Sequence, residues 1–319
     1  MRTPARGPAT APRGGDAPLG SVYGYAVRSP EPLRYLRAPG RPGAGPVLRV
    51  EVADDGVRPS GEPLRRWVPR PGNPFRAHLF AEGPWYRLWI DGVGWYRIAP
   101  DANEVWLPPD ADPLRREERL YGIPLALLVS RRGALPLHAA TVGIGDGAVA
   151  IAAPGRHGKT TLAAALMAAG HRLLSEDVSC CTLDDDPAVL PGPALLRVRP
   201  DALERLELAS AAVTFADRDR IHLALPEGER GDCSPVPLRA IFLLRPGDER
   251  PRATPVAPHA AVRDLWALST KLPTEDDRAR CFAGVATLVD RVPTYDLSRP
   301  NRWELLPATA ELVAEVATS

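Results

Sequence analysis

The segment that most restricts how this chain can fold is the ten-residue stretch 152–161, which reads Ala-Ala-Pro-Gly-Arg-His-Gly-Lys-Thr-Thr. An apolar run, 148–151, precedes it, and a helix-favouring run, 162–167, follows it. A strand, a glycine-containing loop and a helix in this order form the usual setting of a phosphate-binding loop. The backbone N–H groups of such a loop and of the first helical turn have no intrahelical partner and can face an anion. The stretch therefore predicts a nucleotide site, with an ordinary strand–turn–helix as the alternative.

Seven residues of this stretch are the predicted nucleotide-binding residues: Gly155, Arg156, His157, Gly158, Lys159, Thr160 and Thr161. We expect Lys159 to reach the outer phosphates and the Thr160 hydroxyl to bind Mg²⁺. Only two lysines occur in this arginine-rich chain, and one stands in the loop, where a compact ammonium suits better than a guanidinium. The full pattern has glycine where Ala153 stands, so the loop is a variant.

Composition limits the class of protein. A length of 319 residues favours one large domain or two ordinary ones, and 45% hydrophobic with 25% charged residues is ordinary for a globular protein. The net charge of +1 gives no electrostatic reason to expect a nucleic acid or a membrane as partner, and no apolar run approaches about 20 residues. The four cysteines show no C-x-x-C spacing, which favours a cytoplasmic protein without a disulfide framework or zinc site. Composition leaves open whether the chain forms a homo-oligomer.

The chain divides into three predicted parts. Residues 1–20, rich in Pro, Ala, Gly and Arg, predict a disordered tail. Residues 21–111 predict a smaller, mainly β domain, in which Asp91-Gly92 between two β-prone runs indicates a hairpin. Its many aromatic residues suit a sheet core, with a peptide-recognition surface as the alternative.

Residues 112–319 predict an α/β domain. A helix over 112–133 should kink or break at Pro124. Short strands and helices then alternate, and the long apolar run 236–244 is expected to be a central strand.

Three further features suggest chemistry next to the loop. Glu176 and Asp177 follow a short strand beyond the loop helix, where one acid could accept a proton from a hydroxyl and the other could hold Mg²⁺. His138 stands on the strand before the loop and could orient an acid or contact a phosphate, although a buried structural histidine is the alternative. Arginines near the later strands could pair with transferred phosphoryl charge: Arg197, Arg199, Arg218, Arg220, Arg230 and Arg239.

These motifs together resemble a known family. The tracts 137–139, 147–149, 158–161 and 174–177 look like the kinase domain of HPr kinase/phosphorylase. The longer tracts 131–138, 171–177, 190–197 and 200–203 are most similar to the HPr-kinase-like proteins of ribosomal-peptide gene clusters, notably the lasso-peptide kinases.

The resemblance implies a P-loop kinase domain of HPr-kinase type that uses ATP and Mg²⁺. Glu176 falls on the first acid of the family pair, the presumed base, and Asp177 on the second, a metal partner together with Thr160. His138 falls on the family histidine that assists the acids. The implied activity is an ATP-dependent serine kinase acting on a peptide, with a Ser near the C-terminus of a lasso-type precursor peptide as the acceptor.

Departures from the family keep two alternatives open. Arg156 stands where the family loop usually has glycine, and the first acid is Glu rather than Asp. The chain could therefore be a non-catalytic nucleotide- or peptide-binding module with a degraded loop, or a kinase of a carrier protein such as HPr. The sequence alone does not identify the acceptor, the oligomeric state or the nucleotide preference.

Overall fold

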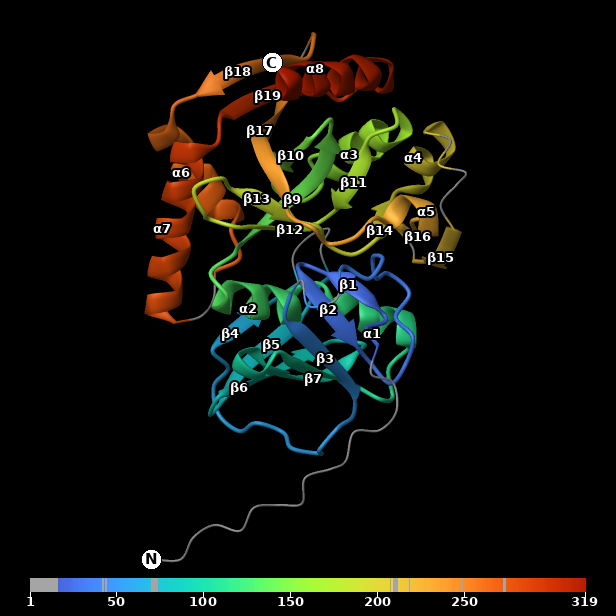
Figure 1. The fold of residues 1–319 in the computed structure, drawn as a ribbon, viewed down its shortest axis with the longest axis vertical. Helices are drawn as coiled ribbons and strands as arrows, with labels where there is room; N and C mark the ends of the chain where they lie inside the picture. The colour runs from blue at the N-terminus through green and yellow to red at the C-terminus, as the bar shows by residue number, and fades with distance from the viewer. Residues whose placement is uncertain are drawn as a thin grey trace, which may run out of the picture.

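The computed structural model describes residues 17–41, 43, 45–69, 74–206, 208, 212–217, 219–247, 249–271 and 274–319. Of the predicted tail, residues 1–16 lie outside the described residues, and Gly20 already begins the first strand. The described chain is a mixed α/β structure with three sheets, and Figure 1 shows the N-terminal sheet at one end of the molecule and the other two at the opposite end. The domain boundaries predicted above stay predictions.

The first sheet holds eight strands in the order β1-β2-β3-β8-β7-β6-β5-β4. Their bounds are β1 Gly20–Val22, β2 Tyr25–Arg28, β3 Val47–Val52, β4 Arg65–Trp67, β5 Ala77–Glu82, β6 Trp85–Ile90, β7 Gly94–Ala99 and β8 Glu104–Leu107. The predicted hairpin is confirmed, since β6 and β7 pair antiparallel around a turn in which Gly92 has φ 70°. A short 3₁₀ helix, η1 Pro100–Ala102, precedes β8.

The aromatic residues of this sheet divide between its two faces. Tyr86 and Tyr96 are buried in the core, as the sheet-core interpretation expects. Trp85 and Trp106 lie half-buried on the other face, because successive side chains of a strand alternate. The Arg97 guanidinium lies over both indole rings, 3.8 Å from the Trp85 centroid and 4.6 Å from that of Trp106.

Two helices link the first sheet to the second. The helix expected over 112–133 is broken into α1 Pro113–Leu120 and α2 Ile123–Arg131, and Pro124 lies in the first turn of α2, where its missing N–H costs nothing. The Asp112 side chain caps α1 by accepting from the Arg115 N–H. α2 contacts β7 of the first sheet and β9 of the second, so it lies between them (Figure 1).

The second sheet carries the phosphate loop. Its strand order is β10-β9-β12-β13-β17-β19-β18, with β11 also paired to β9 and β10 to β17. The bounds are β9 Leu135–Ile144, β10 Gly147–Ala152, β11 Arg172–Ser175, β12 Val178–Cys181, β13 Ala188–Leu190, β17 Val236–Gly247, β18 Arg252–Val256 and β19 Thr294–Pro300. The long apolar strand β17 is central as predicted, because it pairs parallel with both β10 and β19. The carboxyl ends of these three strands therefore meet at one edge.

Helices cover both faces of this sheet. Alternate residues of β10 divide between two cores: Val149 and Ile151 pack in one, with helices α3 Lys159–Ala168 and α8 Leu306–Thr318. Ala148 and Ala150 pack in the other, with α6 Pro258–Leu268 and α7 Glu275–Arg291. β10 is therefore buried on both faces, and the loop begins at its carboxyl end.

A third, smaller sheet lies beside α3. It has the order β14-β16-β15, with bounds β14 Leu195–Val198, β15 Ala212–Ala216 and β16 Ile221–Ala224. Short helices α4 Pro200–Arg205 and α5 Glu227–Arg230 flank it, and a 3₁₀ turn, η2 Trp303–Leu305, precedes α8. None of the described helices has both the length and the apolar character needed to cross a membrane.

Candidate active site

The phosphate loop connects the carboxyl end of β10 to the N-terminus of α3. Gly158 is the N-cap of α3 with φ 87°, a left-handed conformation that favours glycine. A Cβ at this position would also displace the Arg299 guanidinium, which occupies that space. Arg156 has φ 68°, which is strained for a residue with a side chain. All seven predicted nucleotide-binding residues line one large cavity.

Lys159 is buried at the base of the loop. Its Nζ donates to the carbonyl oxygens of Ala153 at 2.8 Å and Pro154 at 3.3 Å, and it lies 3.0 Å from His138 Nε2. Burial lowers the pKa of Lys159, while the nearby carboxylates of Asp177 and Glu176 oppose that shift. Lys159 therefore lies at the base of the loop and contacts His138, one of the predicted site residues.

The predicted acid pair lies in the connection between β11 and β12, next to the start of α3. Thr160 Oγ1 donates a hydrogen bond of 2.6 Å to Glu176 Oε1, and the Glu176 side chain is only 7% exposed. The Asp177 side chain is 41% exposed and contacts His138 and Arg197. Apart from Arg197, which contacts both, the two adjacent acids thus have different partners, and they differ in access to solvent.

His138 joins the loop to Asp177. Its Nδ1 lies 3.2 Å from Asp177 Oδ1, because β9 and β12 pair with His138 opposite Val178. The Lys159 ammonium has no lone pair and can only donate, so His138 Nε2 accepts and Nδ1 carries the proton that faces Asp177. Lys159, His138 and Asp177 consequently form one hydrogen-bonded chain.

Arg197 on β14 is one of the arginines predicted to pair with phosphoryl charge, but its contacts with carboxylates were not predicted. Its guanidinium contacts three carboxylates: Nε to Glu176 Oε2 at 2.8 Å, Nη2 to Asp177 Oδ2 at 2.9 Å, and Nη1 to Glu118 Oε1 at 2.8 Å. Burial on its own would raise the pKa of Asp177, but the Arg197 charge and the His138 hydrogen bond hold that pKa well below its usual range. Asp177 is therefore ionised at neutral pH.

The remaining arginines of the predicted set divide into two groups. Arg199 and Arg220 line the cavity, and Arg220 donates to the Arg197 carbonyl oxygen at 2.8 Å. Arg230 donates to the Leu225 carbonyl, and Arg239 pairs with Asp146, so neither faces the loop. Arg218 lies outside the described residues.

Two further polar residues at the site had no usable sequence signal. Glu118 comes from α1, 79 residues before Arg197 in the chain. His222 lies buried on β16 between Glu118 and Asp217, with Nδ1 3.6 Å from Glu118 Oε2. Only the tertiary fold brings these side chains to the acid pair.

The cavity at this site measures about 1790 Å³. One side is formed by the loop, the acid pair and the ends of β17 and β19, and the opposite side by residues of the first sheet such as Arg65 and Trp67. Thr160 and Glu176 present two hard oxygen donors side by side, which suits Mg²⁺. Within the described ranges no group of three or more His, Cys, Asp or Glu residues could hold a metal by itself. Nucleotide phosphates and water would have to complete its shell.

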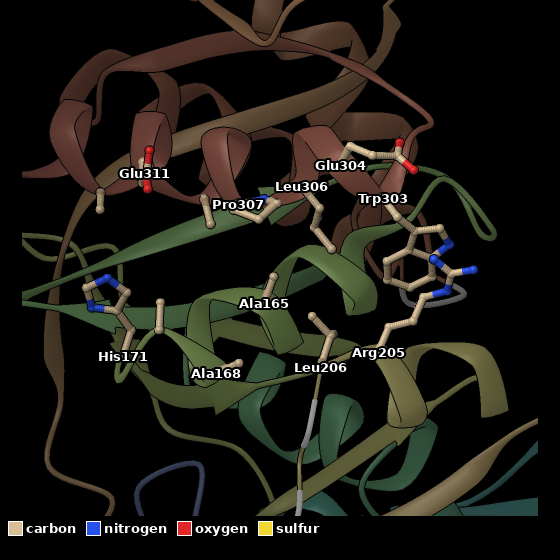
Figure 2. A pocket seen from close by; sticks show the side chains of 13 residues that line it. Ala165, Ala168, His171, Arg205, Leu206, Trp303, Glu304, Leu306, Pro307 and Glu311 are labelled. Carbon is tan, nitrogen blue, oxygen red and sulfur yellow. The ribbon is translucent and has the colours of Figure 1, made fainter.

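A second cavity, of about 680 Å³, lies between α3, α4 and α8 (Figure 2). Its wall is mostly apolar, and His171, Arg205 and Glu311 lie at its periphery. It contains none of the predicted site residues, although Trp303 and Leu306 line both cavities.

Comparison with known proteins gives distant likenesses among solved structures only. No family model matches the chain, and no curated protein matches it. Among solved structures the chain is similar to the Hpr(Ser) kinase/phosphatase from Coxiella burnetii, with 12% identity and a TM-score of 0.33. The match covers 56% of this chain and 94% of that one. At this distance the function has to be argued from the residues of the site.

Proposed function

We propose that this protein is an ATP-dependent serine kinase that phosphorylates a peptide hydroxyl. The observation that carries the proposal is the direct connection of the loop to both acids: Thr160 bonds Glu176, and Lys159 bonds His138, which in turn contacts Asp177. A phosphate loop alone indicates nucleotide binding. Two acids that are connected to the loop by hydrogen bonds and line the same cavity support transfer of a phosphoryl group to a hydroxyl.

The distances favour a particular division of roles between the acids. Buried Glu176 shares a hydrogen bond with the Thr160 hydroxyl, so these two oxygens would hold Mg²⁺, which when bound neutralises phosphate charge. The sequence assigned that role to Asp177 and the role of base to Glu176. Asp177 is more exposed and is oriented by His138, which suits contact with an incoming acceptor. We therefore assign the base to Asp177.

The proton step follows from this assignment. Asp177 is ionised at neutral pH and has an open side toward the cavity, so it can align the acceptor hydroxyl and take its proton as the oxygen bonds to phosphorus. Lys159 would leave the loop carbonyls to contact the phosphates, and the backbone N–H groups at the start of α3 would hold them. No covalent enzyme intermediate is needed.

The size of the cavity supports a peptide acceptor. Pockets for single small ligands span about 300–1000 Å³, and this cavity exceeds that range. Its far wall, which includes Arg65 and Trp67 of β4, provides room for a chain next to the nucleotide. The narrower assignment, a Ser near the C-terminus of a lasso-type precursor, is supported by the sequence resemblance alone.

Phosphoryl transfer is tested by mass spectrometry. Wild-type protein is incubated with MgATP and C-terminal peptides from precursor genes beside its own gene, and with HPr as an alternative acceptor. We expect a mass gain of one phosphoryl group on a peptide Ser, abolished in Asp177→Asn and Glu176→Gln but retained in Asp184→Asn, an acid outside the cavity. No transfer to any of these peptides would contradict the peptide-kinase assignment, and transfer to HPr alone would identify a carrier-protein kinase.

A nucleotide-binding module without catalysis is the second candidate. The strained φ of Arg156 favours it, because the loop lacks glycine where the family has it. Calorimetry with MgATP on Lys159→Ala tests whether nucleotide binding depends on the loop lysine. Lys271→Ala is the control, because it removes the only other lysine of the chain. Binding that needs Lys159 without any transfer would support the module, whereas absence of binding would refute both functions.

A further inference from the structure

Arg299 lies at the carboxyl end of β19, next to the phosphate loop. β19 runs parallel to β17 and β17 to β10, so the end of β19 reaches the same sheet edge as the loop that follows β10. The Arg299 guanidinium lies directly against Gly158, in the space that a Cβ there would fill. The residue lines the large cavity and is only 8% exposed.

The unusual property of Arg299 is that its side chain has no partner among the described residues. Four arginines are buried in the described part of the chain: Arg37, Arg87, Arg116 and Arg299. Arg37 donates to the carbonyl oxygens of Gly192, Leu173 and Leu174. Arg87 pairs with the carboxylates of Asp55 and Glu82. Arg116 pairs with Glu31 and donates to the carbonyl oxygens of Pro108 and Pro109. For Arg299, within the described ranges, no side-chain hydrogen bond or ion pair is formed, and burial lowers its pKa without an opposing carboxylate. Burying a charge without a partner is costly.

The position of the guanidinium makes this cost greater. Gly158 is the N-cap of α3, and the N-terminus of a helix carries partial positive charge from its free N–H groups. A cation placed there faces a like charge and no acceptor. An anion bound between the guanidinium and the helix N-terminus would compensate the charge of both.

We infer that Arg299 is a phosphate-contacting residue of the nucleotide site, which binds the polyphosphate of ATP together with Lys159 and the loop N–H groups. The inference rests on the proposed function and adds a cation from the last strand of the sheet to it. Lys159 is satisfied by the Ala153 carbonyl and His138 in the free protein, whereas Arg299 is held unpaired beside the loop. Arg299 is thus already in place before the nucleotide binds.

The test compares Arg299→Gln with Arg245→Gln. Arg245 lies at the same sheet edge, but its charge is already paired with Asp264 and Asp296. Affinities for MgATP and for magnesium pyrophosphate are measured by calorimetry, and thermal midpoints of the free proteins by scanning calorimetry. We expect Arg299→Gln to weaken both ligands about 10- to 100-fold, the range of a charge-assisted hydrogen bond, and Arg245→Gln to weaken them less than about threefold.

The outcomes separate a phosphate contact from a structural role. We expect the thermal midpoint of free Arg299→Gln to equal or exceed that of wild type, since an unpaired buried charge is removed. A lower midpoint, a loss of ATP affinity without loss of pyrophosphate affinity, or unchanged affinity for both would each overturn the inference while the proposed function stands. If wild-type protein binds neither ligand, the proposed function and the inference both fail.

Discussion

Replacing Arg197 by Met would test whether one guanidinium holds the active-site acids together. Met keeps much of the length of the side chain and removes every donor. Glu176 and Glu118, whose side chains are 7% and 8% exposed, would each lose a 2.8 Å hydrogen bond to a positive charge. Removing one partner of a buried ion pair costs about 3–5 kcal/mol, because the other charge stays buried without compensation. We therefore expect the free energy of unfolding at pH 7 to fall by about that amount.

The pH dependence of this loss gives a sharper check. In wild type the folded-state pKa of Asp177 is depressed, so the stability it contributes is present above the unfolded value of about 3.9 and is lost as pH falls through the folded value. Without Arg197 only His138 opposes the effect of burial on the pKa of Asp177, so Asp177 takes up its proton at a higher pH than in wild type. The difference in stability between wild type and Arg197→Met should therefore be largest at pH 7 and shrink as pH falls below about 5, through the unfolded value of about 3.9.

Urea denaturation followed by circular dichroism at pH 7 and at about pH 4 measures this difference. Arg239→Met is the matched control, since Arg239 pairs with an exposed Asp146 at 3.5 Å and its removal should leave stability unchanged. A loss below about 1 kcal/mol at pH 7, well under the cost of breaking a buried pair, would refute the reasoning. An equal loss at both pH values would show that Arg197 acts by packing rather than by charge.

Three further substitutions probe the loop. Arg156→Gly should raise the free energy of unfolding by about 0.5 kcal/mol in urea denaturation, because glycine removes the strain of the left-handed backbone but adds entropy to the unfolded chain. A lower free energy of unfolding would contradict this. Gly158→Ala should weaken MgATP at least about tenfold by calorimetry, because a Cβ collides with Arg299 and strains φ; wild-type affinity would argue against that crowding. Thr160→Val should lower stability by about 1–3 kcal/mol through the unsatisfied Glu176 oxygen and abolish peptide phosphorylation, with both restored in Thr160→Ser.

The parts of the fold that the sequence predicts correctly are set by local chemistry. The strand–loop–helix around Lys159, the turn at Gly92 and the break before Pro124 each follow from residues within one or two turns of each other. Strands β12 and β14 were not predicted. Each has only four residues, and their apolar side chains fit several structures equally well.

The missed strands explain why the partners of Arg197 were not predicted. On sequence it is one of many arginines, and its distinction is that β14 brings it between Glu176 and Glu118, which are 21 and 79 residues away along the chain. The local sequence pattern shows that Arg197 is charged, but it does not show which carboxylates the guanidinium contacts. The three predicted site residues Lys159, His138 and Asp177 do form one hydrogen-bonded chain in the structure, although their chemical roles stay predictions.

The different surroundings of Glu176 and Asp177 follow from strand geometry that no sequence pattern determines. Glu176 and Asp177 lie in the bend between β11 and β12, where Glu176 contacts Thr160 at the start of α3 and Asp177 contacts His138 on β9, while Arg197 contacts both acids. The register of β12 on β9, with Val178 opposite His138, then places the histidine beside Asp177 rather than Glu176. A shift of one residue would turn His138 to the other face of the sheet and separate it from both Asp177 and Lys159. The assignment of base and metal ligand therefore depends on this register.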